Sequence, residues 1–140
     1  MRLFAKLITK HGPELVDDVK NHIIEETAAR FAETEFDQRD LAGVKAYLWE
    51  GLGTGFSFEC VEDSPSRLSY RVHRCFLAEA AAKHNLPELG YAFYCAWDEG
   101  FCRGLNPRIK FTRTQTLMQG DPCCDHTYQL DPPRQSTEDQ

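Results

Sequence analysis

Hydrophobic residues recur every three to four positions after Pro13, and charged residues fall between them. This spacing is typical of an amphipathic helix, and it predicts one of roughly 20 residues. A second helix is expected over residues 40–49, because the glycine-rich stretch 51–55 would end it. The repeating apolar face of the first helix consists of Leu15, Val19, Ile23, Thr27 and Phe31.

The pattern changes to a period of two in two later regions. Residues 56–60 and 68–72 alternate apolar with polar around the turn 63–66, which predicts a β-hairpin with one apolar face. Residues 109–116 and 124–130 form a second predicted pair of strands, joined by a turn at 119–122. Successive side chains of a strand point to opposite faces, so each pair presents one side to a core.

Two further helices are expected between these hairpins, over residues 74–84 and 88–103, where alanine and leucine are frequent and Gly104 follows as a C-cap. The order of elements predicts an α+β fold, with one antiparallel sheet of about four strands and helices packed on one face. Residues 1–130 are expected to form a single α+β domain. The polar residues 131–140 are predicted to be a disordered tail.

Composition narrows the classes of function. Of the 140 residues, 41% are hydrophobic, which is enough to bury a core without disulfide bonds. The formal net charge is −6 and the basic residues form no stripe, so we expect no nucleic-acid partner. The sequence contains no run of about 18 apolar residues, so it predicts no membrane span. The first residues carry no export signal, so we expect a cytoplasmic protein whose six cysteines are free thiols.

Reactive side chains are placed at spacings that bring them together. Cys95, Asp98 and Cys102 follow i, i+3, i+7 spacing, so they share one face of the predicted helix. Cys124 and His126 are two residues apart on the last predicted strand and therefore point to the same side of the sheet. These positions predict one pocket that contains thiol, carboxyl and imidazole groups.

Two kinds of chemistry fit this group. Thiolates and carboxylates bind divalent metals such as Zn or Mn, and the predicted metal ligands are Cys75, Cys95 and Cys124. Such a metal would activate a water, with Asp98 or His126 moving the proton. Alternatively, Cys95 or Cys124 is a nucleophile that His126 activates while Asp98 orients the imidazole.

A purely structural reading is also open, because free cysteine is often buried as a small hydrophobic residue. We expect this role for Cys60, Cys102 and Cys123. A small-molecule carboxylate substrate would need a cation, and the predicted substrate-binding residues are Arg74 and Arg113. Both belong to a group of basic residues that stands out in an acidic chain, namely Arg71, His73, Arg74, Arg108, Lys110 and Arg113.

Several of these segments together resemble the L-2-amino-thiazoline-4-carboxylic acid hydrolase family. The resemblance spans roughly residues 12–128. It implies hydrolytic opening of a cyclic amidine ring to a carbamoyl-cysteine, on a route of cysteine biosynthesis in bacteria. Its motif positions here are Cys75, Cys95, Asp98 and Cys124, while His126 stands where an aromatic or other residue is often found. The segments are 74–75, 87–89, 94–98, 111–117 and the Gly-Asp-Pro-Cys-Cys-Asp-His run at 120–126.

The competing hypothesis is a non-enzymatic module in which the same cysteines bind zinc or line a small-molecule pocket. A third alternative is an interaction domain whose cysteines only pack. The sequence leaves the true substrate and the oligomeric state open, and a homo-oligomer is among the alternatives.

Overall fold

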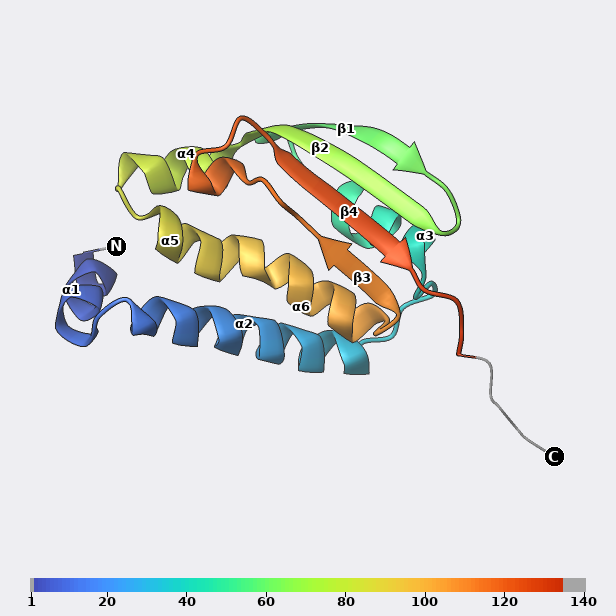
Figure 1. Cartoon of the computed structure of the whole chain (residues 1–140), viewed down its shortest axis with the longest axis horizontal. Coiled ribbons are helices and arrows are strands. Elements are labelled where there is room, and N and C mark those ends of the chain that lie inside the picture. The colour runs from blue at the N-terminus through green and yellow to red at the C-terminus, as the bar shows by residue number, and fades with distance from the viewer. Residues whose placement is uncertain (1, 135–140) are drawn as a thin grey trace.

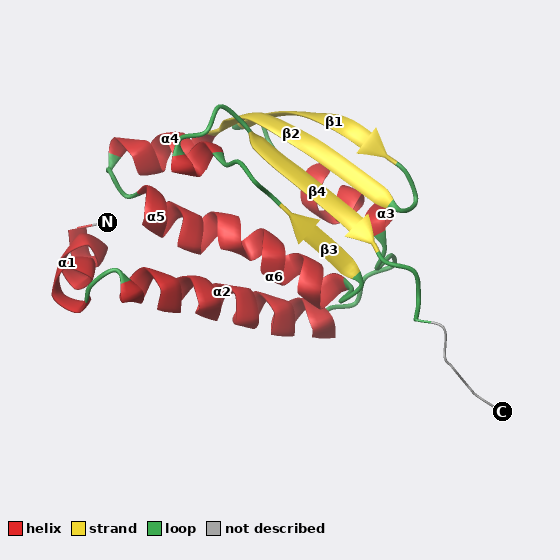
Figure 2. Cartoon of the chain, in the orientation of Figure 1, coloured by secondary structure: helices red, strands yellow, loops and turns green. Residues whose placement is uncertain are grey.

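A computed structural model describes residues 2–134 and shows a four-stranded sheet with helices beneath it (Figures 1 and 2). The strand order is β1-β2-β4-β3, and every neighbouring pair is antiparallel. The predicted α+β fold is therefore confirmed. The strands are β1 Phe56–Asp63, β2 Arg67–Cys75, β3 Ile109–Thr112 and β4 Cys124–Leu130.

Helices α2 and α6 run side by side under one face of the sheet (Figure 1). Gly100 and Gly104 make this close approach possible, because a Cβ at either position would lie less than 3.0 Å from atoms of α2. No helix within residues 2–134 is long and apolar enough to cross a membrane. The helices are α1 Arg2–His11, α2 Glu14–Glu33, α3 Leu41–Val44, α4 Phe76–Lys83, α5 Pro87–Gly90 and α6 Ala96–Leu105.

Two helices contain a π-helical turn, in which the backbone makes wider turns than in an α-helix. One turn, Lys45–Trp49, follows α3, and the other, Tyr91–Cys95, joins α5 to α6. The segment predicted as one helix over 88–103 is therefore helical throughout, but the π-helical turn interrupts its α-helical geometry. Such turns are frequent at functional sites, and both of these end at residues that line the cavity described below.

The alternation seen in the sequence decides which face of the sheet is buried. Leu68, Tyr70 and Val72 of β2 are buried, and the residues between them are not. Cys124, His126 and Tyr128 of β4 continue the same face, as β2 pairs with β4 from Arg67 to Val72. This face and the helices enclose the core, whose largest fully buried side chains include Tyr128, Phe101, Leu68 and Leu105.

Arg39 connects the ends of the two long helices. Its guanidinium donates hydrogen bonds to the carbonyl oxygens of Gly104 and Leu105 at 3.1 Å, and to carbonyl oxygens near the end of α2. The last carbonyls of a helix have no partner within the helix, so a cation there satisfies them and interacts favourably with both helix dipoles.

The structure corrects several boundaries predicted from the sequence. Residues 2–11 form a helix that the pattern did not indicate, and the helix expected from Arg74 begins at Phe76, because Arg74 and Cys75 complete β2. Cys60 is exposed instead of buried, since β1 has an irregular register between Cys60 and Glu62. The part of the predicted tail from 135 to 140 lies outside the described residues.

The strand expected to run through residue 116 ends at Thr112. The chain turns away there because the Asp125 carboxylate accepts hydrogen bonds from the backbone N–H groups of Thr114 and Gln115, at 2.8 and 2.7 Å, and from the Thr114 hydroxyl. These bonds replace the ladder bonds that a longer strand would make.

Candidate functional site

A cavity of about 380 Å³ lies where α6 and its preceding turn meet the ends of β2 and β4. Three sulfur atoms reach its wall from different elements: Cys75 ends β2, Cys95 ends the π-helical turn and Cys124 begins β4. Asp98, Arg113 and His126 contribute the polar groups. The other lining residues are Leu48, Trp49, Leu52, Phe56, Val72, Leu77, Phe93, Tyr94, Trp97 and Met118.

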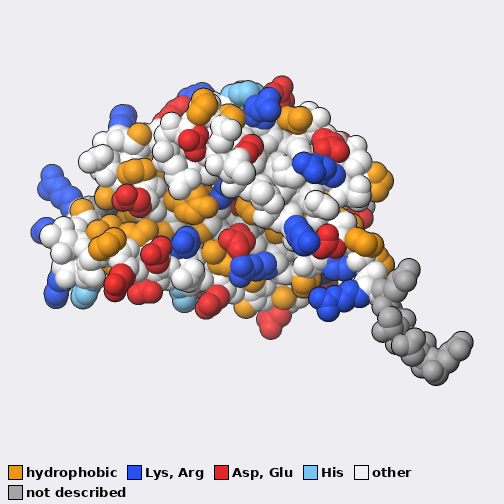
Figure 3. Space-filling model, in the orientation of Figure 1, with side chains coloured by type: hydrophobic (Ala, Val, Ile, Leu, Met, Phe, Trp, Pro, Cys, Tyr) orange, Lys and Arg blue, Asp and Glu red, His pale blue; other side chains and the backbone are white. Residues whose placement is uncertain are grey.

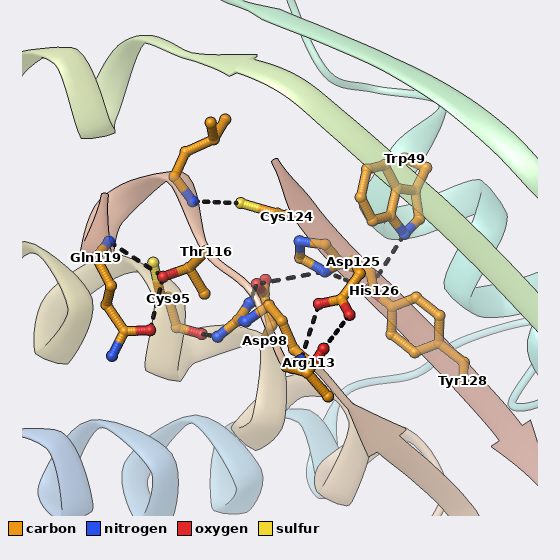
Figure 4. A network of polar contacts seen from close by, with 12 residues as sticks. Trp49, Cys95, Asp98, Arg113, Thr116, Gln119, Cys124, Asp125, His126 and Tyr128 are labelled. Carbon is orange, nitrogen blue, oxygen red and sulfur yellow. Dashed lines mark hydrogen bonds and ion pairs between the residues drawn. The ribbon is translucent and has the colours of Figure 1, made fainter. Parts of the chain in front are cut away.

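Asp98 and Arg113 form a buried ion pair at the wall of this cavity (Figure 4). Arg113 Nη1 donates to Asp98 Oδ2 at 2.8 Å, and Nη2 donates to the carbonyl oxygen of Cys95 at 3.0 Å. The side chain of Asp98 is 18% exposed, and that of Arg113 is 5% exposed. Burial raises the pKa of Asp98 to about 6, and the adjacent guanidinium limits this rise. A carboxyl group that titrates near neutral pH is suited to proton transfer.

His126 faces the same carboxylate. Its Nδ1 lies 4.0 Å from Asp98 Oδ2 and 3.3 Å from the hydroxyl oxygen of Tyr128. Its Nε2 has no hydrogen-bond partner in the described part of the chain, yet it is not among the fully buried unpaired atoms. Burial lowers the pKa of His126 to about 3, and the positive charge of Arg113 acts in the same direction. The imidazole is therefore neutral at physiological pH.

The three cavity cysteines are close enough to influence one another. The charges of Cys124 and Cys75 both contribute to raising the pKa of Cys95, although burial is the main cause, and the pKa reaches about 12. Burial also raises the pKa of Cys124, but the backbone N–H of Leu117 donates to its Sγ at 3.1 Å and opposes this rise. Of these two thiols, Cys124 is the one whose thiolate receives a hydrogen bond.

Asp125 is a positioning residue that the sequence analysis did not identify. By binding the backbone of Thr114 and Gln115, it fixes the segment that carries Arg113 toward Asp98. Partial burial alone would raise the pKa of Asp125, but these hydrogen bonds lower it below the usual value. The sequence did contain a signal for this role. Asp125 lies between Cys124 and His126 on a predicted strand, so its side chain points to the opposite face of the sheet.

Trp49 is the second residue that was missed. Its ring stacks on Tyr70 at 4.0 Å between centroids and meets the His126 ring edge-on at 4.9 Å. Its Nε1 donates to the hydroxyl oxygen of Tyr128 at 3.2 Å, and that oxygen lies beside His126 Nδ1. The sequence indicated only that a helix ended here, because an aromatic residue at a helix end has no distinctive spacing.

The structure does not bring all predicted site residues together. Arg74 is on the exposed surface, where its guanidinium binds Glu79 with an Nε to Oε1 distance of 2.8 Å, and it does not line the cavity. Lys110 pairs with Asp131, and His73 lies near Glu59, so the predicted basic group is dispersed. Cys102 packs in the hydrophobic core, as expected.

The three predicted metal ligands line the same cavity. Among residues 2–134, no three histidine, cysteine, aspartate or glutamate side chains are arranged to hold a metal ion. Cys75, Cys95 and Cys124 share the cavity without forming such a group, so the residues do not fit a three-ligand site. The metal site stays a prediction, and no chemical step below passes through a metal.

Comparison with known proteins identifies the family. The family model of the L-2-amino-thiazoline-4-carboxylic acid hydrolases matches residues 2–128. The chain belongs to this family. Neither the comparison with curated proteins nor the comparison with solved structures gives a significant match. The matched region of this hydrolase family member contains every lining residue of the cavity, from Leu48 to His126.

Proposed function

We propose that this protein is a hydrolase that opens a cyclic amidine ring, such as that of L-2-amino-thiazoline-4-carboxylate, to a carbamoyl-cysteine. The family assignment supports the reaction class. The observation that carries the proposal is the convergence of thiol groups, Asp98 and His126 on one cavity. Nucleophile, base and orienting carboxylate are the three groups that nucleophilic catalysis requires within reach of one another.

Cys124 is the proposed nucleophile. Burial raises the pKa of its thiol, but the backbone N–H of Leu117 donates to Sγ at 3.1 Å, which stabilises the thiolate and opposes this rise. Cys95 lacks such a donor in the described structure, and its pKa of about 12 keeps it protonated at neutral pH. Cys124 also shares a strand face with His126, two residues away, so thiol and imidazole open onto the same cavity.

His126 is the proposed base, and Asp98 is the proposed orienting group. In the proposed tautomer the hydrogen is on Nδ1, which faces the Tyr128 hydroxyl oxygen at 3.3 Å and the Asp98 carboxylate at 4.0 Å. Nε2 then has a free lone pair, and this nitrogen is the one without a hydrogen-bond partner within residues 2–134. With a pKa of about 3, the imidazole is neutral at physiological pH, so its Nε2 is unprotonated.

The reaction proceeds in two balanced steps. The thiol of Cys124 adds across the carbon–nitrogen double bond of the ring, and its proton passes through His126 to the ring nitrogen. The ring nitrogen takes a second proton from the exocyclic amino group, which becomes an imine, and the carbon–nitrogen single bond of the ring breaks. Water then adds to the carbon of the covalent intermediate, and the Cys124 sulfur leaves and regains a proton. The carbon gains a carbonyl oxygen, and the former ring nitrogen becomes an amine.

Substitution of Cys124 tests this proposal. Cys124→Ser is expected to lower the turnover of L-2-amino-thiazoline-4-carboxylate by at least about 10³-fold, because an unactivated hydroxyl replaces the thiol. Cys60→Ser is the matched control, since Cys60 is exposed and outside the cavity. Turnover is measured as amine release, and circular dichroism checks folding. Full activity in folded Cys124→Ser protein would rule out this nucleophile.

The biological setting is part of the same proposal. A carbamoyl-cysteine product would serve cysteine biosynthesis, and a reducing cytoplasm would keep the cavity thiols free.

Elemental analysis of protein purified without chelator tests the predicted Zn or Mn. A stoichiometric metal that is lost in a Cys75→Ser variant would revive the metal-bound water mechanism.

A ligand-binding module without catalysis is the second candidate. The protonation states favour it, because a neutral Cys95 thiol and a neutral His126 imidazole beside an apolar wall bind small molecules without reacting. The two candidates differ in one measurement. A module would bind a cyclic amidine stoichiometrically and release it unchanged, whereas the hydrolase would release product over repeated turnovers.

A further inference from the structure

Asp98 has one carboxylate oxygen that no other residue uses. Its Oδ2 accepts the hydrogen bond from Arg113 Nη1 at 2.8 Å and lies 4.0 Å from His126 Nδ1. Its Oδ1 has no hydrogen-bond partner within residues 2–134. The only fully buried side-chain nitrogen or oxygen without a partner in that range is Arg113 Nε, so Oδ1 is not sealed by the packing. Because Asp98 lines the cavity, this oxygen is an acceptor that a bound molecule can reach.

The free oxygen of Asp98 selects the kind of group that can lie against it. An ionised carboxylate accepts hydrogen bonds and donates none. An amino group, such as the exocyclic one of a 2-amino-thiazoline ring, is therefore its complement. A carbonyl oxygen in the same place would leave two acceptors facing each other with no hydrogen between them, which is costly in a buried site.

Arg113 holds Asp98 in this orientation. Its Nη1 binds Oδ2, and its Nη2 donates to the carbonyl oxygen of Cys95 at 3.0 Å, so the two oxygens of the carboxylate are not equivalent. The remaining donor, Nε, is buried without a partner, and a substrate carboxylate would reach it only by displacing the residues that cover it. A carboxylate bound elsewhere on the cavity wall needs no such displacement.

Tyr94 offers a donor at the mouth of the cavity. It is the only lining residue that is exposed, at 53%, and its hydroxyl makes no hydrogen bond within the described part of the chain. In Figure 3, hydrophobic side chains on the visible face gather over the end of the molecule that carries α4 and α5, and α5 leads into the turn that contains Tyr94. A phenolic hydroxyl in such surroundings is suited to bind a carboxylate that stays partly hydrated.

Tyr94 and Asp98 are one helical turn apart. Residues at positions i and i+4 lie on the same face, with about 5–6 Å between their Cβ atoms. Tyr94 is in the π-helical turn and Asp98 is in the first turn of α6, and both line the cavity. In L-2-amino-thiazoline-4-carboxylate, the amino group and the carboxylate are on the two carbons that flank the ring nitrogen. They are separated by a distance on the order of one helical turn.

We infer that this helical face orients the substrate: Asp98 Oδ1 accepts a hydrogen bond from the exocyclic amino group, and the Tyr94 hydroxyl donates one to the carboxylate. The inference rests on the proposed function and specifies how its substrate is recognised. The ring between these two ends is presented to Cys124 and His126, which line the same cavity. Asp98 is thus a determinant of specificity for the amino group, and Tyr94 is one for the carboxylate.

Tyr94→Phe tests the carboxylate end, because it removes the hydroxyl and keeps the ring. The two substrates are L-2-amino-thiazoline-4-carboxylate and 2-amino-thiazoline, which lacks the carboxylate. The ratio of their kcat/KM values should fall about tenfold, mainly through KM, because a hydrogen bond to a charged group is lost. Tyr47→Phe is the matched control, since Tyr47 is 40% exposed and does not line the cavity. An unchanged ratio in folded Tyr94→Phe protein would overturn the inference.

Asp98→Asn tests the amino end by replacing an acceptor with a donor. Arg113 Nη1 needs an acceptor, so the amide oxygen takes the place of Oδ2 and the amide NH₂ group takes the place of Oδ1. The ligands are L-2-amino-thiazoline-4-carboxylate and 2-oxo-thiazolidine-4-carboxylate, which has a carbonyl oxygen in place of the amino group. With Asp98 present, the amino compound should bind at least about tenfold more tightly, and Asp98→Asn should remove most of this preference.

This preference is measured as a ratio of Kd values in the Cys124→Ser background, at a pH well above 6, where Asp98 is ionised. Trp49 and Trp97 are the two tryptophans of the chain and both line the cavity, so intrinsic fluorescence reports on its occupancy. Equal binding of the two ligands when Asp98 is intact would overturn the inference without any need for the Asp98→Asn variant. Circular dichroism checks that each variant is folded.

The inference and the proposed function fail in different ways. The Tyr94→Phe comparison is repeated as a ratio of Kd values in the Cys124→Ser background, which needs no turnover. If both binding ratios change as expected but the unmodified protein hydrolyses neither amidine, the proposed hydrolysis fails and the mode of recognition holds. If the unmodified protein hydrolyses the carboxylate substrate but neither ratio changes, the mode of recognition fails and the hydrolysis stands.

Discussion

The buried face of the sheet has two halves that differ in how completely they are filled. In the filled half, Tyr128 belongs to the same core cluster as Phe101 and Leu105, and each of the three is no more than 1% exposed. Under Cys124, at the start of the same strand, the face borders the cavity. The chemistry thus lies where packing is incomplete, and the filled half supplies the stability that this hollow half lacks.

Helix α6 and the turn before it show the same contrast with a single residue type. Cys102 is 1% exposed in the core, whereas Cys95, two turns earlier, lines the cavity. Residue type and helical spacing do not separate these cysteines. What separates them is the part of the sheet that each one faces.

The comparison of halves predicts a large difference in stability between two phenylalanines. Phe101→Ala is expected to lower the free energy of unfolding by about 3–5 kcal/mol, because it opens a void in the filled half. Phe93→Ala should cost only about 1 kcal/mol, since Phe93 is partly exposed beside an existing cavity. Urea denaturation of both variants measures the difference, and equal losses would remove the distinction between the halves.

Within the hollow half, Asp98 is predicted to control catalysis and its pH dependence. In the proposed mechanism the ionised carboxylate, 4.0 Å from His126 Nδ1, orients the imidazole, so activity should be lost as pH falls through about 6, the pKa to which burial raises this group. Asp98→Asn should lower kcat by at least about 10²-fold and remove this acidic limb. A limb near pH 6 that persists in Asp98→Asn protein would assign the titration to another group.

The smallest expected effect separates the two cysteines of this helical segment. Cys102→Ser should destabilise the protein by about 1–3 kcal/mol, because it buries a hydroxyl in the core without a prepared partner. Cys95→Ser should cost less than about 1 kcal/mol, since its side chain borders the cavity. Thermal unfolding at one pH compares them, and a larger loss for Cys95→Ser would mean that the cavity wall is packed as tightly as the core.

Periodicity alone predicted most of the elements. The alternation at 124–130 indicated β4 with its buried face, and the repeat from Leu15 to Phe31 indicated α2. Both patterns arise because one face of a single element packs against the core. A short segment of sequence is enough to reveal such a pattern. The end of β3 at Thr112 was not predictable in this way, because hydrogen bonds from Thr114 and Gln115 to Asp125 on β4 decide it.

The candidate site shows the same division. Spacing placed Cys95 and Asp98 on one helix face, and Cys124 and His126 on one strand face, because each pair depends on local geometry only. The approach of Asp98 to His126, the pairing of Arg113 with Asp98 and the exclusion of Arg74 from the cavity required the packed structure. Contacts between distant segments, and the burial that shifts the pKa values of Asp98 and His126, arise only when the elements pack together.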